Sequence, residues 1–324
     1  MLLKKIMTNT NYKKIIVNKQ VYKLSLEYIL GLFEGDGSIT IQLKSNPRHK
    51  TGTQIVLIFE IHQHVIDKDL LIAISNFLGC GKVEIGRRLG QEDSWTYRFR
   101  VSSQKEMFNK LLPLLRDQTM VLKKRNNDFN LFLKACRIVE EKKHTTEIGQ
   151  NEIRNLRSNY SNKLSFQRKN LLPETLKPLN NEWVTGITDA EGSFSFSINR
   201  KDNAIRGVNF VFVITQEPSE LSFLTNLQTF FKCGNIYTKI EVEDNGKMDG
   251  KFYVSSKEEL EWLRPKIIPF FETNQLQSIK KHSFLRFKRA LEICLNNKPL
   301  LPSHYEQLEA ILSETTGKRP KPKK

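Results

Sequence analysis

The chain carries one stretch of sequence twice, and this internal repeat limits the possible folds more than any other feature. Residues 29–37 read ILGLFEGDG and residues 184–192 read VTGITDAEG, so each copy ends in an acidic residue followed by glycine. The two acids, Asp36 and Glu191, lie 155 positions apart. An offset of 153 positions relates three further pairs: Gln63 and Gln216, Cys80 and Cys233, and the VSS tripeptides that begin at 101 and 254. A near-constant offset over half of the chain predicts two copies of one structural unit.

Each copy reads as the end of a helix followed by a strand. Small residues recur four positions apart in both copies, as Gly31 and Gly35 and as Gly186 and Ala190. Small residues at this spacing let two helix backbones approach closely. The glycine after each acid is suited to the left-handed conformation that ends many helices. If the two helices pack together, Asp36 and Glu191 emerge side by side at the same end.

The residues after each copy predict the remainder of the unit. Strict alternation of apolar and polar residues in 38–44 and 193–199 indicates half-buried strands. The first unit is predicted to have strands at 38–44, 55–63, 82–88 and 94–102 and helices at 67–78, 104–116 and 127–141. The second is predicted to have strands at 193–199, 208–216, 235–243 and 251–255 and helices at 219–231, 257–271 and 283–296. With the opening helices, this gives an α+β fold of two αββαββα repeats, each with one antiparallel sheet of four strands.

The predicted organisation has five parts: a leader at 1–20, a first repeat at 21–146, a linker at 147–179, a second repeat at 180–316 and a tail at 317–324. The linker is polar, rich in asparagine and interrupted by prolines. The tail is cationic and rich in proline, which is typical of disordered segments. The leader contains lysine and asparagine but no arginine or serine, so it fits a transit peptide poorly and is expected to be loosely ordered.

The charge of the chain restricts its partners. A formal net charge of +17 and a pI near 9.6 indicate a polyanionic partner, either nucleic acid or an anionic membrane surface. No apolar run approaches the roughly 18 to 20 residues that span a bilayer. The four cysteines form no CxxC pair, which argues against a zinc site and favours free thiols in a reducing compartment.

The paired acids predict a metal site. Two adjacent carboxylates raise each other's pKa unless a cation lies between them, and the C-terminal end of a helix disfavours further negative charge. A hard divalent ion with oxygen ligands, Mg²⁺ above all, relieves both costs. His62 and His64 are a weaker alternative for a metal site, because the second repeat has Thr215 and Glu217 at the matching positions.

The two nine-residue stretches resemble the signature motifs of LAGLIDADG homing endonucleases, in the single-chain form that carries both copies. The resemblance extends from about Val21 to Thr316. It implies a saddle of two αββαββα halves with double-stranded DNA lying along the sheets. It also implies a monomer that hydrolyses one phosphodiester on each strand, across a narrow minor groove, and leaves short 3′ overhangs. Mg²⁺ is the expected cofactor, with Mn²⁺ as a substitute.

The resemblance also implies roles for particular residues. Asp36 and Glu191 match the metal-binding acids, with the backbone of Gly35 and Ala190 as further candidate ligands. Gln63 and Gln216 match a polar residue near the scissile phosphates. A basic residue ahead of the last helix of each repeat completes the catalytic set. The candidates are Lys123, Lys124 and Arg125 in the first repeat and Lys280 and Lys281 in the second. Aligning Phe129 with Phe284 and Phe132 with Phe287 pairs Arg125 with Lys280.

Strand parity predicts the DNA contacts, because polar side chains on one face of a sheet can reach base edges and phosphates. In the first repeat the candidates are Ser38, Thr40, Gln42, Lys44, Arg48, Lys82, Arg88, Arg98 and Arg100. In the second they are Ser193, Ser195, Ser197, Asn199, Arg200, Arg206, Lys239 and Lys251.

One alternative function stays open at this point. Relatives of this family can act as maturases that bind their own intron RNA, sometimes without cleaving DNA, and a pure RNA-binding protein has no need of the acid pair. The expected location is the mitochondrion, from the habit of the family and from a composition rich in Lys, Asn and Ile that AT-rich organellar genes produce. A protein encoded in the organelle needs no cleavable transit peptide.

Overall fold

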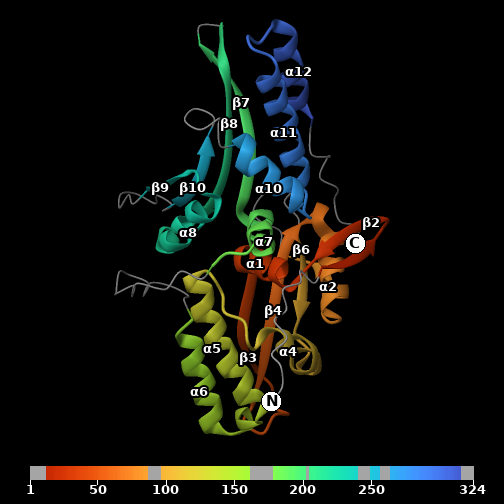
Figure 1. Cartoon of the computed structure of the whole chain (residues 1–324). Coiled ribbons are helices and arrows are strands. Elements are labelled where there is room, and N and C mark those ends of the chain that lie inside the picture. The colour runs from red at the N-terminus through yellow and green to blue at the C-terminus, as the bar shows by residue number, and fades with distance from the viewer. Residues whose placement is uncertain are drawn as a thin grey trace, which may run out of the picture.

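The computed structural model describes residues 12–86, 96–160, 178–201, 204–239, 249–255 and 263–314. Two similar halves lie on either side of a central pair of helices, α1 (Leu26–Asp36) and α7 (Asn181–Glu191) (Figure 1). Long hairpins extend from this pair in opposite directions, one from each half. Among these residues, no helix combines the length and the apolar character needed to cross a membrane.

The first half follows the predicted αββαββα order. Its sheet consists of β3 (Gly37–Ser45), β4 (Thr53–His64), β5 (Lys82–Ile85) and β6 (Thr96–Val101), in the antiparallel order β3-β4-β6-β5. Its helices after α1 are α2 (Lys68–Leu78), the short helices α3 (Gln104–Glu106) and α4 (Leu112–Leu115) joined by a π-helical turn, and α5 (Lys123–Glu140). The apolar residues of β3, β4 and β6 form the core under these helices.

The second half repeats this arrangement. Its sheet consists of β7 (Gly192–Lys201), β8 (Ala204–Gln216), β9 (Asn235–Lys239) and β10 (Asp249–Ser255), in the order β7-β8-β10-β9. Its helices after α7 are α8 (Leu221–Phe231), α10 (Ile268–Thr273) and α11 (Lys280–Asn296). The two four-stranded sheets therefore have the same strand order, and the predicted fold class and duplication are confirmed.

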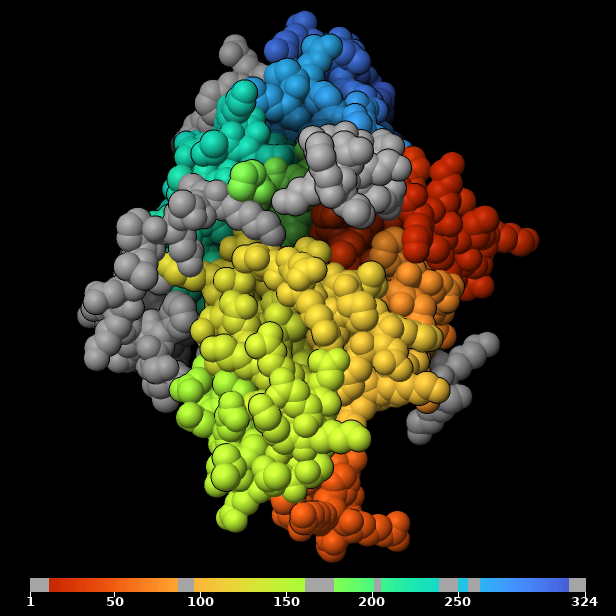
Figure 2. All heavy atoms as spheres, turned by 60° about the horizontal axis from the view of Figure 1, so that its bottom comes forward, coloured from red at the N-terminus to blue at the C-terminus, as the bar shows by residue number. Residues whose placement is uncertain are grey.

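Three elements were not predicted. A hairpin of β1 (Lys13–Val17) and β2 (Gln20–Leu24) occupies part of the leader and the start of the first repeat, and it projects from one side of the molecule (Figure 2). Within the leader, residues 13–17 form a strand and Val17 is buried, so the expectation of a loosely ordered leader is wrong from Lys13 onward. A helix, α6 (Glu147–Ser158), occupies the start of the predicted linker, because Ile153 packs into the core and Thr146 caps the first turn. The third, α12 (Pro302–Ser313), packs beside α11.

The α1–α7 contact is as close as the small residues predict. A β-carbon added at Gly31 would lie 2.2 Å from the carbonyl oxygen of Trp183, and one at Gly186 would lie 2.1 Å from that of Tyr28. At Gly35 it would lie 2.3 Å from the β-carbon of Ala190. Since real side chains do not reach such distances, each of these glycines is required by the opposite helix.

The predicted left-handed caps are wrong. Gly37 and Gly192 follow the acids with φ of −93° and −79° and extended backbone, because the strand begins directly at each glycine. Their lack of a side chain has another reason. A β-carbon on Gly37 would lie 2.4 Å from the carbonyl oxygen of Phe33, and one on Gly192 would lie 2.6 Å from that of Thr188. The chain therefore turns from helix to strand within one residue.

Candidate active site

The two repeated acids meet at the adjoining ends of α1 and α7. Asp36 is the last residue of α1 and Glu191 the last residue of α7. Burial raises the pKa of Asp36 to about 7, and the nearby carboxylate of Glu191 adds to the increase, whereas Lys280 opposes it. Burial likewise raises the pKa of Glu191, against the opposing charges of Lys280 and Arg125. The tertiary structure thus brings together two carboxylates that are costly to ionise without added positive charge.

The two predicted glutamines lie beside these acids. Gln63, at the end of β4, donates a hydrogen bond from Nε2 to Oδ2 of Asp36 at 2.6 Å. Gln216, at the end of β8, lines a cavity together with Glu191. In the first repeat, the amide therefore fixes the carboxylate of Asp36 in one orientation.

The basic residues of the two repeats lie at equivalent places. Arg125 donates from Nε and Nη2 to the carbonyl oxygen of Glu34 at 3.3 and 3.2 Å, and its guanidinium lies over the ring of Phe33. Lys280 donates from Nζ to the carbonyl oxygens of Ala190 at 2.5 Å and Thr188 at 3.5 Å. Burial lowers the pKa of both cations, which the surrounding carboxylates oppose. Each cation is thus attached to the last turn of the helix that carries the acid of its own repeat.

Other candidates in the catalytic set are placed differently. Lys124 is half exposed and forms an ion pair with Glu217 of the second repeat at 3.0 Å, so its side chain points away from Asp36. The carbonyl oxygen of Ala190, proposed as a metal ligand from its position, accepts the hydrogen bond from Lys280. One lone pair of that oxygen is therefore occupied by the lysine, and the other remains for a metal.

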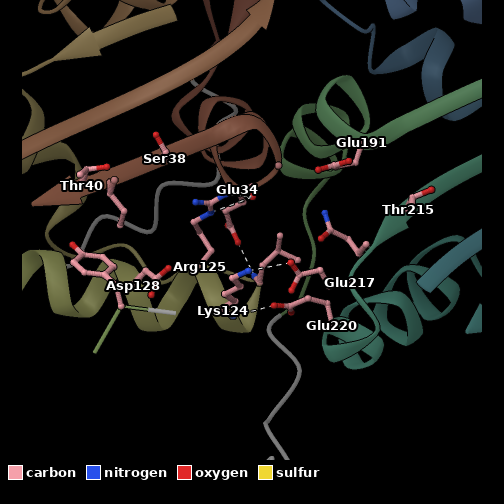
Figure 3. A pocket seen from close by; sticks show the side chains of 15 residues that line it. Glu34, Ser38, Thr40, Lys124, Arg125, Asp128, Glu191, Thr215, Glu217 and Glu220 are labelled. Atoms are coloured by element: carbon pink, nitrogen blue, oxygen red, sulfur yellow. Dashed lines mark hydrogen bonds and ion pairs between the residues drawn. The ribbon is translucent and has the colours of Figure 1, made fainter. Parts of the chain in front are cut away.

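A cavity of about 540 Å³ opens between the repeats beside these groups (Figure 3). It is lined by Ser38 and Thr40 of β3, by Arg125 of α5 and by Glu191 of α7. Figure 3 shows Arg125 turned toward Glu34, and Lys124 toward Glu217 on the opposite side. Side chains from both repeats therefore face one polar space next to the paired helices.

The sequence profile of a family described as LAGLIDADG endonuclease matches this chain twice, at residues 29–136 and 184–291. The chain belongs to the LAGLIDADG endonuclease family. Both motifs occur in one chain, which is the double-motif form of the family. The matched regions contain both acids, both glutamines and both basic residues of the site.

Individual relatives of this chain are distant. The chain is 25% identical to "Probable intron-encoded endonuclease 2" of Neurospora crassa over 86% of its own length and 62% of the relative. It is 24% identical to "Intron-encoded DNA endonuclease aI3" of Saccharomyces cerevisiae over 90% of its length and 70% of the relative. A further Neurospora crassa relative, "Probable intron-encoded endonuclease 3", is covered over 52% of its length. The chain thus spans less than two thirds of both Neurospora relatives.

Solved structures share the whole fold. The LAGLIDADG homing endonuclease I-SmaMI bound to cleaved DNA superposes with a TM-score of 0.76 at 22% identity, over 89% of this chain and 96% of the other. The meganuclease I-CpaMI bound to uncleaved DNA gives a TM-score of 0.74 at 21% identity, over 90% and 99%. Nearly the whole length of each of these known structures is therefore matched by this chain.

The polar faces of the two sheets differ in charge. In the first sheet, Ser38, Glu60, Arg100 and Lys82 lie in one cross-strand row. Glu60 pairs with Arg100 at 3.2 Å and with Arg98 at 3.4 Å, and Arg98 also binds Glu84 at 2.7 Å. Sequence reasoning identified the cations but missed both glutamates, which the alternating pattern places on the same face.

The equivalent row of the second sheet is uncharged. It consists of Ser193, Val213, Tyr253 and Asn235. Lys251 lies in the next row, between Thr215 and Tyr237. The two sheets therefore present different chemistry to any ligand that lies along both.

The remaining predicted DNA contacts are scattered along the hairpins. Thr40, Gln42 and Lys44 continue along β3, and Ser195, Ser197 and Asn199 continue along β7 with exposed side chains. Arg48 lies in the turn between β3 and β4, Arg206 is exposed on β8, and Arg200 binds Glu309 of α12. Arg88 and the side chain of Lys239 lie outside the described residues.

The first acid of each motif, Glu34 and Asp189, was not singled out from the sequence. Both are buried and hydrogen-bonded across the two repeats. Glu34 accepts from the indole N–H of Trp183 at 2.8 Å, and Asp189 accepts from the hydroxyl of Tyr28 at 2.8 Å. Trp183 and Tyr28 are themselves 155 positions apart, which is the offset of the acids. Glu34 and Asp189 could have been found from the sequence by applying the same offset to every polar residue of the motifs.

Proposed function

We propose that this protein is a sequence-specific DNA endonuclease that cuts one phosphodiester on each strand of a duplex. The observation that carries the proposal is the pair Asp36 and Glu191, held together at the ends of two packed helices with one cation beside each. The polar sheets on both sides suit a long duplex. Relatives named as intron-encoded endonucleases and structural neighbours bound to DNA support it.

The proposed cofactor is Mg²⁺, with Mn²⁺ as a substitute. The donor set fits a hard cation, because Asp36 and Glu191 offer carboxylate oxygens and burial raises the pKa of each. Among the described residues, no cluster of three or more His, Cys, Asp or Glu side chains could complete a site from protein ligands alone. Water and phosphate oxygens would fill the remaining positions, as is usual for Mg²⁺. When bound, the ion supplies Lewis-acid stabilisation of the charge that develops on the phosphate.

The protein groups around the acids have distinct proposed roles. Lys280 and Arg125 provide fixed positive charge beside each acid, where negative charge develops on the attacked phosphate. Gln63 holds the carboxylate of Asp36 at 2.6 Å and orients it. Burial of these groups strengthens their electrostatic effect, because the effective dielectric constant is lower away from solvent.

A cleavage assay tests the proposed function. Plasmids that carry a library of randomised sites are incubated with the protein in Mg²⁺ or in EDTA, and linearised molecules are sequenced. We expect Mg²⁺-dependent double-strand cuts at one family of related sites. Tight binding of intron RNA without any Mg²⁺-dependent cut would instead indicate a maturase that has lost cleavage.

The charged sheet predicts the composition of the target. An arginine fork donates well to guanine O6 and N7, and a carboxylate accepts from cytosine N4. We therefore propose that Arg98, Arg100 and Glu84 contact G·C pairs, while Val213 and Tyr253 contact a half-site richer in A·T. In the selected sites, one half should carry more fixed G·C pairs. Arg98→Ala should relax the sequence in that half only.

The net charge predicts strong salt dependence of DNA binding. Each neutralised phosphate contributes about −0.9 to the slope of log affinity against log salt. With several cations along each hairpin, we expect a slope steeper than about −4 for the cognate duplex, measured in Ca²⁺ by fluorescence anisotropy. A flat response would contradict the use of the positive charge in DNA binding.

The raised pKa of Asp36 predicts a pH-dependent effect of Mg²⁺ on stability. Between its ordinary pKa of 3.8 and about 7, Asp36 keeps its proton in the folded protein and loses it in the unfolded chain. The stability of the metal-free protein therefore falls as pH rises through this range. Mg²⁺ binds the ionised form, so its stabilising effect should grow by about 1 kcal/mol between pH 6 and pH 8.

Differential scanning calorimetry with and without Mg²⁺ measures this effect. Asp67, whose pKa burial also raises to about 7, adds a pH dependence both with and without Mg²⁺. The double variant Asp36→Asn with Glu191→Gln should show no Mg²⁺-dependent increase at either pH. An equal increase at pH 6 and pH 8 in the wild type would remove Asp36 from the metal site.

The proposed location is the mitochondrion. Two relatives from Schizosaccharomyces pombe are named for introns of cox1, at 26% and 25% identity. An immunoblot of purified mitochondria against the cytosolic fraction tests this location.

A further inference from the structure

Each helix that carries a basic residue of the site is hydrogen-bonded at its start to an acidic side chain from the other repeat. The backbone N–H groups of Lys123 and Lys124, at the start of α5, donate to Oε2 and Oε1 of Glu220, both at 2.9 Å. The N–H of Ile279, just before α11, donates to Oδ1 of Asp67 at 2.7 Å. Glu220 belongs to the second repeat and α5 to the first, whereas Asp67 belongs to the first and α11 to the second.

The two contacts are equivalent under the internal repeat. Asp67 and Glu220 are 153 positions apart, which is the offset of Gln63 and Gln216. Each lies in the single 3₁₀ turn that follows the long second strand of its sheet, at Val65–Asp67 and Pro218–Glu220. Their exposed fractions are 7% and 3%. A carboxylate so far from water is costly unless hydrogen bonds compensate it, and here the compensation comes from helix N–H groups.

The residues before the two helices supply few acceptors of their own. The residues at the cap positions are Leu122 for α5 and Ile279 for α11, which have no side-chain acceptor. The first N–H groups of a helix carry partial positive charge and need acceptors. At α5, Glu220 of the opposite repeat supplies both acceptors in place of the Ser, Thr, Asp or Asn that would ordinarily precede the helix. At α11, the hydroxyl of Ser278 accepts from the N–H of Lys280 at 3.1 Å, and Asp67 of the opposite repeat accepts from the N–H of Ile279.

The first acids of the two motifs, Glu34 and Asp189, accept hydrogen bonds from the residues that precede these contacts. Here the acid and the residue that it binds belong to the same repeat. Glu34 accepts from the N–H of Leu122 at 2.6 Å, and Asp189 accepts from the N–H groups of Gln277 and Ser278 at 2.7 and 3.2 Å. Each entry turn is therefore clamped twice, by one acid from its own repeat and by one from the other. The contacts from the other repeat are those next to Arg125 and Lys280 in the chain.

We propose that Asp67 and Glu220 are positioning residues that act across the repeats: Asp67 sets the place of Lys280, and Glu220 sets the place of Arg125. This inference rests on the proposed endonuclease function. Each repeat thus positions the cation of the other repeat, and each cation acts mainly on one of the two strand cuts. Loss of one acid should then impair mainly one of the two strand cuts.

Strand-specific cleavage rates test the proposal. A cognate duplex is labelled at a different 5′ end in each of two reactions, and the rate of each cut is measured in Mg²⁺. Lys280→Ala and Arg125→Ala first establish which strand depends on which cation. We expect Asp67→Ala to change the ratio of the two rates at least tenfold, in the same direction as Lys280→Ala. Glu220→Ala should change it in the opposite direction, as Arg125→Ala does.

Conservative variants separate positioning from folding. Asp67→Asn keeps the one oxygen that accepts from Ile279, so it should restore most of the wild-type ratio. Glu220→Gln keeps one of two acceptor oxygens, so it should restore the ratio only in part. Both variants serve as the test if the alanine variants do not fold. Asp69→Asn, two residues away with an exposed bond to Asn18, is the matched control and should leave the ratio unchanged. Equal slowing of both strands, or an unchanged ratio, would overturn the proposal. Absence of any cut by the wild type would instead overturn the endonuclease function.

Discussion

Asp36→Asn and Glu191→Gln are each expected to abolish double-strand cleavage while the protein keeps its DNA affinity within about tenfold. Each change removes one negative charge from the proposed metal site but keeps the size of the side chain. Since metal stabilisation of the attacked phosphate contributes several kcal/mol, the rate should fall by about 10³-fold or more. The measurement is single-turnover cleavage of a cognate duplex, with affinity measured in Ca²⁺.

The neighbouring acids provide the control for this result. Glu217 lies at the rim of the same cavity with an exposed side chain, and its known contact is the exposed ion pair with Lys124. Glu217→Gln tests whether any loss of negative charge near the site lowers the rate. An Asp36→Asn or Glu191→Gln variant that still cuts both strands at the wild-type rate would remove that acid from the mechanism.

Alanine at Gly31 or Gly186 is expected to destabilise the protein and separate the two acids. The new β-carbon would lie 2.2 or 2.1 Å from a carbonyl oxygen of the opposite helix, so the backbones must move apart. Overpacking of this kind costs about 1–3 kcal/mol for each change. In the double variant, the two losses in the free energy of unfolding should combine. That variant should retain little cleavage, since a shift of the helices displaces Asp36 from Glu191.

Ala190→Gly is the matched control at the same interface. It removes a β-carbon that faces Gly35 and leaves the helices free to stay in contact. The expected cost is therefore only the lower helix propensity of glycine, about 1 kcal/mol. Urea unfolding measures all of these variants. If Gly186→Ala unfolded at the same urea concentration as the wild type, the close contact in this interface would not contribute to stability as proposed.

The sequence predicted the elements near the repeats well because their signals are local. Alternation of apolar and polar residues identified β3 and β7, and the apolar spacing of 67–78 identified α2. Prediction from the sequence missed elements in which the apolar pattern is short or interrupted by charged residues. In the β1–β2 hairpin, the strands read KKIIV and QVYKL, so neither shows strict alternation over its five residues. Helix α6 is polar except for a few residues such as Ile153. These elements are stabilised by the core that they cover, which a local pattern does not reveal.

The assignment of basic residues shows the same division. Alignment of two phenylalanine pairs favoured Arg125 over Lys124, but three adjacent cations left the choice open. The structure distinguishes the two residues, because in the first turn of α5 Arg125 points toward Glu34 and Lys124 points toward Glu217. Adjacent residues on a helix point about 100° apart, so only the position of the helix on its neighbours decides which of them reaches the acids.

The sequence by itself determined the duplication, the identity of the paired acids and the close approach of the two helices, since all three follow from a repeated pattern and from the absence of side chains. Only the tertiary structure decided which acids hold the site together. Four acids bind groups far away in the chain: Glu34, Asp189, Asp67 and Glu220. Each of them accepts from backbone N–H groups at the start of α5 or α11. Such bonds depend on where a helix begins in space, and neither spacing nor composition encodes that position.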